Sequence, residues 1–307
     1  MPSPTSVEAE AIARHVFGVD VQSCVRFPTG LRHWVYDIEL LDGTQAVVRL
    51  SDPRHRDELR GGVFWNEQLR SVDVRVPELI ASDIDGGQPF MVLERLPGTD
   101  LGNIFDELSE SQLGHIATRV AEFQHRASQL RTASGFGYAL DYGTPLSSSW
   151  AAVLAASISR SERRIVDAGI IDPGWVDRVR RRQAQARDTF DDIPPTAFLH
   201  DATTKNLIIS DGHVTGIVDT DEMGFGDPLW TVALTRMSLL SAGRPTGYID
   251  RLLEAMGAPS AGRLDLYTAV FALDFLSELG QRFNRDEAQP VSGDEVERLL
   301  SVLTDLL

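Results

Sequence analysis

Apolar positions along the chain follow two different periods, which divide it into a β-rich first third and a mainly helical remainder. Residues 5–17 begin with a Thr-Ser cap signal and continue with apolar residues at helical spacing, and residues 57–71 repeat this helical period. Between and after these segments lie short runs rich in β-branched and aromatic residues, and Asp42-Gly43 marks a hairpin turn. We expect strands at 21–27, 34–41, 45–50, 76–80 and 89–96.

The pattern changes after Pro97-Gly98. The helical period then dominates, apart from one β-like island, and the closing stretch 294–307 is an amphipathic helix expected to pack on the body of the protein. The chain is therefore expected to be an α+β protein, with a small β-rich domain over 1–97 and a larger, mainly helical domain over 98–307. The segments behind this expectation are a helix over 109–130, arginine-rich helical sequence over 147–190, the island over 196–220, and helices to the end.

Charge and cysteine content narrow the possible partners. The chain carries 29 Lys and Arg against 45 Asp and Glu, a net charge of −16, which repels nucleic acid and anionic membranes and attracts cations. We expect no nucleic-acid partner and interpret the arginines at 178–182 as a solvated helix face. No apolar run reaches the ~18 residues of a membrane span, and the first residues lack the pattern of a signal peptide. Cys24 is the only cysteine, so no internal disulfide can form and a cytoplasmic protein is expected. We expect it to be a monomer or a homodimer.

The β-like island carries the chemistry. Runs at 207–209 and 214–218, joined by Ser210-Asp211-Gly212, predict a hairpin with Asn206 at the start of one strand and Asp219 at the end of its neighbour. Those two ends are adjacent in an antiparallel pair, and paired oxygen ligands suit Mg²⁺. Asp201 lies one loop earlier, within reach of a hydroxyl to be activated. An Asp base followed by an Asn and an Asp on a metal is a phosphoryl-transfer layout.

The same segment resembles the aminoglycoside phosphotransferase family. That family has the pattern H-G-D-x-x-x-x-N, then I-D-W-E and later G-D-P; this chain has LHDATTKN, then VDTD and Gly226-Asp227-Pro228. The resemblance extends over residues 25–233, and the sequence beyond it matches only in being helical. It implies a two-lobed protein-kinase-like fold and an ATP-dependent O-phosphotransferase, with another nucleoside triphosphate as an alternative to ATP.

Within the first lobe the resemblance assigns the nucleotide contacts. PTGLRHWVYDIEL looks like the loop that covers the nucleotide phosphates, and LERLPG looks like the hinge between the lobes, whose main chain would meet the adenine. The implied contacts come from Gly30 in the loop, from Arg49 on the third strand paired with Glu67 on the helix, and from the hinge residues Glu94 and Leu96.

Several positions depart from the family pattern. Leu199 stands where the family usually has the loop-supporting His, and His200, directly before Asp201, is interpreted as a packing residue. Arg49 replaces the usual Lys but can still form bidentate hydrogen bonds with a phosphate or a carboxylate. Thr231 takes a position that often carries Asp, and Asp227 is expected to cap the following helix.

Lys205 is the only lysine among the 29 basic residues, and it falls inside the motif. We interpret it as a catalytic ammonium near the transferring phosphate, although a single lysine must fall somewhere. The net charge favours a cationic acceptor such as an aminoglycoside or amino alcohol; a macrolide or a neutral sugar is the alternative. A nucleotide-binding module without catalysis is a further hypothesis. The expected acceptor contacts are Asp221, Glu222, Asp274 and Glu278, of which Asp221 could equally touch the metal or be merely solvated.

Overall fold

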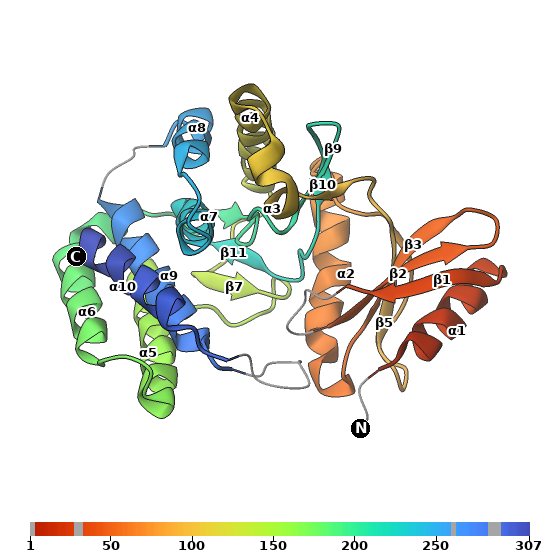
Figure 1. Cartoon of the computed structure of the whole chain (residues 1–307), viewed down its shortest axis with the longest axis horizontal. Coiled ribbons are helices and arrows are strands. Elements are labelled where there is room, and N and C mark those ends of the chain that lie inside the picture. The colour runs from red at the N-terminus through yellow and green to blue at the C-terminus, as the bar shows by residue number, and fades with distance from the viewer. Residues whose placement is uncertain (1–3, 28–32, 259–261, 282–289) are drawn as a thin grey trace.

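An antiparallel sheet of five strands forms the N-terminal part of the chain (Figure 1). The computed structural model describes residues 4–27, 33–258, 262–281 and 290–307. Every neighbouring pair in this sheet runs antiparallel, which confirms the predicted β-rich first third. The strands lie in the order β1 (Val21–Arg26), β2 (Trp34–Leu40), β3 (Gln45–Leu50), β5 (Phe90–Glu94) and β4 (Leu79–Asp83).

A helix covers each face of this sheet. α1 (Ser6–Phe17) packs on the face that includes Val48, and α2 (Arg56–Ser71) packs through Leu59 on the opposite face. Side chains alternate between faces along a strand, so Arg49 of β3 points to the α2 side. The basic residue predicted on the third strand therefore lies under α2.

One strand begins later than predicted. The sequence indicated a strand over 76–80, whereas β4 spans Leu79–Asp83. Pro77 has no N–H to contribute to a ladder, and its carbonyl oxygen accepts a hydrogen bond from the side-chain amide of Asn66 on α2 at 2.8 Å. The segment around Pro77 therefore anchors α2 before pairing begins.

The rest of the chain is mainly helical and contains the largest apolar core, as predicted (Figure 1). The region predicted as helical over 147–190 divides because Gly169, at φ 64°, ends one helix in the left-handed conformation. The helices are α3 (Leu101–Ile104), α4 (Glu110–Ala127), α5 (Trp150–Ala168), α6 (Gly174–Gln185), α7 (Leu229–Ser241), α8 (Gly247–Met256), α9 (Arg263–Glu278) and α10 (Gly293–Leu306). α9 contacts α5, α6, α7 and α10, while α4 contacts α8. None of the described helices combines the length and apolarity needed to cross a membrane.

Two small antiparallel sheets support the loops of the helical part. The predicted hairpin is confirmed as β9 and β10, and β6, β7, β8 and β11 are short additions that the sequence pattern did not indicate as separate strands. One sheet has the order β10 (His213–Ile217), β9 (Leu207–Ser210), β6 (Thr99–Asp100), and the other β7 (Gly137–Ala139), β11 (Met223–Phe225), β8 (Ala197–Phe198). The fold is thus α+β and kinase-like. We call residues 1–97 the N-lobe and 98–307 the C-lobe; that boundary stays a prediction.

Candidate active site

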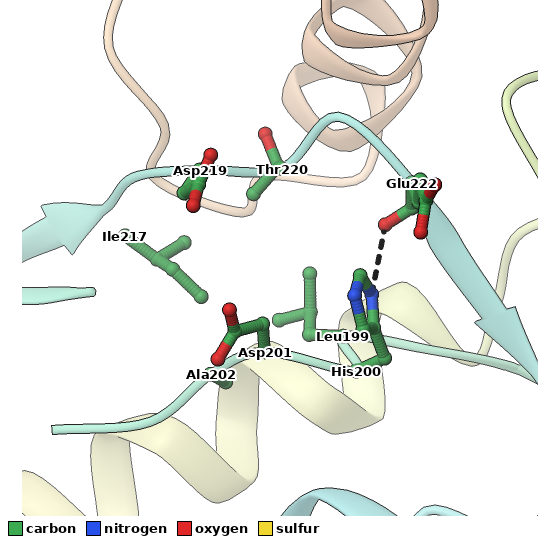
Figure 2. Close-up of a pocket in the computed structure, with 8 residues that line it drawn as sticks. All are labelled: Leu199, His200, Asp201, Ala202, Ile217, Asp219, Thr220 and Glu222. Carbon is green, nitrogen blue, oxygen red and sulfur yellow. Dashed lines mark hydrogen bonds between the residues drawn. The ribbon is translucent and has the colours of Figure 1, made fainter. Parts of the chain in front are cut away.

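The loop after β8 and the segment after β10 face each other across a small pocket (Figure 2). Asp201 lies on the loop side and Asp219 on the opposite side, with their carboxylates directed into the space between them. Ile217 and Leu199 contribute the apolar part of the lining. Glu222 and His200 are drawn together at one end of the pocket by a contact of 3.1 Å between His200 Nδ1 and the Glu222 carbonyl oxygen. The structure therefore brings the predicted base and the predicted metal ligand to one site.

The β9–β10 hairpin positions Asn206 and Asp219. The Val218 N–H donates to the Asn206 carbonyl oxygen at 2.9 Å, so Asp219 directly follows a residue bonded to Asn206. Asp219 has a φ of 61°, a left-handed conformation that turns the chain abruptly at the end of β10. Its side chain remains 49% exposed, whereas Asn206 is buried. This abrupt turn directs a hydrated carboxylate into the pocket.

Asp201 is held on both of its carboxylate oxygens. The Thr203 hydroxyl donates to Oδ1 at 3.0 Å, and the Lys205 ammonium lies 3.2 Å from Oδ2. The Asn206 side-chain amide donates to the Asp201 carbonyl oxygen at 2.9 Å, which closes the loop on itself. Burial works against the charge of Lys205, but the carboxylates of Asp201 and Asp219 outweigh it and raise the pKa of the ammonium. Lys205 is therefore a cation at the rim of the pocket.

Leu199 cannot support the loop through its side chain, and two residues that the sequence analysis did not single out for this role do so instead. Gln124 of α4 donates from Nε2 to the Leu199 carbonyl oxygen at 2.8 Å and accepts from its N–H at Oε1, at 3.0 Å. The Thr231 hydroxyl donates to the same carbonyl oxygen at 2.6 Å. A glutamine within the apolar stripe of α4 was the signal in the sequence. His200 packs its ring on Tyr138 at 4.8 Å, in keeping with a packing role.

The ion pair predicted between Arg49 and Glu67 is wrong. Glu67 is exposed on α2, and Arg49 instead donates to Asp221, from Nη1 to Oδ1 at 2.9 Å and from Nη2 to Oδ2 at 2.7 Å. Nη2 also lies 3.1 Å from Asp219 Oδ1. Asp221 receives a further contact of 3.1 Å from His33 Nε2. The residue expected to touch acceptor or metal is thus the partner of Arg49.

Two other predicted acceptor contacts lie on α9 and are paired with arginines of α5. Arg160 Nη2 is 3.3 Å from Asp274 Oδ1, and Arg164 Nη1 is 3.4 Å from Glu278 Oε1. Burial and the neighbouring Asp274 raise the pKa of Glu278, against the opposing charges of Arg164, Arg160 and Lys205. Both acids are nevertheless partly neutralised.

Two main-chain groups of the predicted hinge already have partners within the protein. The Glu94 N–H donates to the Glu78 carbonyl oxygen at 2.8 Å, and the Leu96 carbonyl oxygen accepts from Arg95 Nη1 at 2.7 Å. In the described part of the chain the Leu96 N–H has no hydrogen-bond acceptor, so it is available to a ligand. Gly30 lies outside the described residues.

Asp227 holds the start of α7, as predicted. Its Oδ1 accepts the Leu229 N–H at 3.1 Å, and its Oδ2 accepts the Tyr267 hydroxyl at 2.9 Å. Arg263 completes the set with Nε at 3.2 Å from Oδ2. Asp227 is buried and both of its carboxylate oxygens have partners, so it stabilises the packing behind the loop.

The donors at the pocket fit a magnesium ion supplied with a nucleotide. Among the residues described, no group of three or more His, Cys, Asp or Glu is arranged as a self-sufficient metal cage. Asp219 and Asn206 offer two hard oxygen ligands, and the Asn206 Oδ1 has no hydrogen-bond donor in the described structure. Mg²⁺ typically takes one or two protein oxygens and completes its shell with phosphates and water.

Comparison with known proteins supports the fold and identifies the family. A variant of the aminoglycoside phosphotransferase APH(4)-Ia, in a ternary complex with AMP-PNP and hygromycin B, superimposes with a TM-score of 0.67 at 19% identity over 98% of each chain. The GDP complex of wild-type aminoglycoside 2′-phosphotransferase-IIIa gives 0.72 at 16% identity, over 99% of this chain and 98% of that one. At these identities the likeness concerns the fold. None of the curated protein sequences matches the chain. The sequence pattern of the phosphotransferase enzyme family (APH) matches residues 23–267, and the chain belongs to that family.

Proposed function

We propose that the protein is an ATP-dependent O-phosphotransferase that acts on a hydroxyl group of a small molecule. The observation that carries this proposal is that Asp201 and Asp219 line the same pocket. Asn206 bonds to the Asp201 carbonyl oxygen through its side chain, and its own carbonyl oxygen accepts from Val218, the residue before Asp219. A base and two metal-binding oxygens in that order are what phosphoryl transfer requires. The structural relatives that hold AMP-PNP and GDP support a nucleoside triphosphate as the donor.

In this proposal each residue has a defined task. Asp201 orients the acceptor hydroxyl and takes its proton, and Lys205 beside it meets the negative charge of the phosphoryl group in transfer. Asn206 and Asp219 hold Mg²⁺, which neutralises charge on the β- and γ-phosphates when bound. The Leu96 N–H meets the adenine. Catalysis arises mainly from positioning and from charge stabilisation.

For the acceptor we propose a cationic alcohol or amino sugar, with a macrolide or neutral sugar as the alternative. The net charge of −16 and the position of Glu222 on the pocket support a cation. The pairing of Asp274 and Glu278 with Arg160 and Arg164 weakens that support, because a cationic group would have to compete with two guanidinium groups. An acceptor with few positive charges therefore fits better than a polycation.

The test is a transfer assay with γ-labelled ATP or GTP, Mg²⁺ and a panel of cationic and neutral hydroxyl compounds. Label should move to at least one acceptor with the parent protein, and at least about 10²-fold more slowly with Asp201→Asn. Thermal stabilisation by the nucleotide without transfer to any acceptor would favour a nucleotide-binding module instead. The absence of both responses would contradict the proposal altogether.

A further inference from the structure

Arg49 and Asp221 form a nearly water-free ion pair between the lobes. The Arg49 side chain is 9% exposed and that of Asp221 is 14% exposed, and two hydrogen bonds of 2.9 and 2.7 Å join them in a fork. Removing one partner would leave the other charge in this buried site with weaker compensation, which is costly. Arg49 lies on the N-lobe sheet and Asp221 follows β10 of the C-lobe, so the ion pair joins the two lobes.

Two adjacent glycines in α2 make room for this pair. A Cβ on Gly62 would lie 2.5 Å from Asp221 Oδ1, and a Cβ on Gly61 would lie 2.4 Å from the Asp221 carbonyl oxygen. Glycine is an unfavourable residue in the interior of a helix. α2 carries two in succession at the point where Asp221 approaches it, so the helix surface leaves room for this carboxylate.

The two hydrogen bonds from Arg49 to Asp221 also determine how closely the guanidinium approaches Asp219. Nη2 is shared between Asp221 Oδ2 at 2.7 Å and Asp219 Oδ1 at 3.1 Å, and the shorter contact is the one to Asp221. Without the Asp221 carboxylate the guanidinium would have Asp219 as its remaining acidic partner within hydrogen-bond reach. A closer guanidinium on Asp219 would compete with a metal ion for the same oxygen.

We propose that Asp221 is a positioning residue that takes the place of the predicted helix glutamate as the partner of Arg49: it engages the guanidinium and keeps it from neutralising Asp219. This inference rests on the proposed function, in which Asp219 is a metal ligand. It assigns Asp221 a role in setting the affinity for metal-bound nucleotide rather than in touching the acceptor.

The first measurement is the Mg²⁺ concentration that gives half of the thermal stabilisation by ATP, which does not depend on turnover. Asp221→Asn should raise that concentration about tenfold, equivalent to ~1.4 kcal/mol. The double variant Asp221→Asn/Arg49→Met removes the competing guanidinium and should bring the concentration back to within about threefold of the parent. A purely structural role for Asp221 predicts no such return, and its absence in a folded double variant would overturn the proposal.

A second pair of variants tests the contact with α2. Gly62→Ala should push Asp221 away and raise the Mg²⁺ requirement as Asp221→Asn does, while Gly114→Ala on α4, where a Cβ meets its nearest described neighbour at 3.6 Å, should leave it unchanged. Glu67→Gln should match the parent as well. Parent-like values for both Gly62→Ala and Asp221→Asn would refute the inference. If the parent itself shows no Mg²⁺-dependent response to ATP, the proposed function fails instead.

Discussion

The side-chain amide of Gln124 bonds both backbone groups of Leu199, with its Nε2 at 2.8 Å from the carbonyl oxygen and its Oε1 at 3.0 Å from the amide nitrogen. This contact joins the middle of α4 to the residue two positions before Asp201. All of these groups are buried, so the amide replaces water for the loop backbone. The loop is therefore fixed by its main chain, whatever side chain occupies position 199.

Gln124→Leu should destabilise the protein and slow the reaction together. The substitution keeps the volume but leaves the Leu199 N–H without a partner, a loss of about 1–3 kcal/mol in the free energy of unfolding. Urea denaturation and steady-state kinetics measure the two effects. Gln129→Leu, at an exposed position in the turn that follows α4, is the control. Equal stability of the two variants would contradict the role given to Gln124.

Asp201→Asn should lower kcat by about 10²–10⁴, because the amide cannot take the proton of the acceptor hydroxyl. Nucleotide binding, measured by calorimetry, should stay close to that of the parent, since the proposed contacts at Leu96, Asn206 and Asp219 are unchanged. Asp250→Asn on the exposed face of α8 serves as the matched change. A kcat within a few-fold of the parent would remove Asp201 from the mechanism.

Lys205→Ala should reduce kcat by about 10²-fold, or ~2.7 kcal/mol of transition-state stabilisation. Lys205→Arg should recover only part of this, because a planar fork does not replace a compact ammonium 3.2 Å from Asp201. The side chain is 63% exposed, so the melting temperature should hardly move in either variant. If both keep the parental kcat, the lone lysine is a coincidence of composition.

Asp219→Ala should abolish the Mg²⁺ dependence of nucleotide binding, since the variant loses the exposed carboxylate at the pocket. Calorimetric titration of ATP with and without Mg²⁺ measures this directly. Asp211→Ala, at the turn of the β9–β10 hairpin, also changes an aspartate with positive φ and controls for the backbone effect. An unchanged Mg²⁺ dependence in Asp219→Ala would rule out this ligand.

For a cationic acceptor, kcat/KM should fall as salt rises. The Debye length shrinks from ~10 Å at 0.1 M to ~3 Å at 1 M, which screens the attraction between the acidic protein and the acceptor. A neutral hydroxyl compound turned over by the same protein should show a much flatter dependence. Equal slopes for the two acceptors would favour the macrolide or neutral-sugar alternative.

The sequence predicted the positions of candidate site residues where those residues belong to one local element of secondary structure. Asn206 and Asp219 could be placed together because one hairpin, set by the turn at Ser210-Asp211-Gly212, determines both positions. Arg49 was correctly placed on the third strand, but its partner was not found, because Asp221 is 172 residues away and the contact depends on how the lobes meet. Gln124 and Leu199 are 75 residues apart, and their pairing is likewise tertiary. Spacing in one chain does not report such contacts.

The left-handed backbone conformation of Asp219 is unfavourable for stability, whereas its carboxylate is needed for the proposed metal binding. At a φ of 61° an aspartate is tolerated, whereas a glycine would adopt the same conformation freely. Substitution by glycine would release this strain and at the same time delete the carboxylate. With Asp219 as the proposed metal ligand, selection for heat resistance alone would favour the loss of metal binding at this position. A thermostable form of the enzyme has to be sought with residue 219 held fixed.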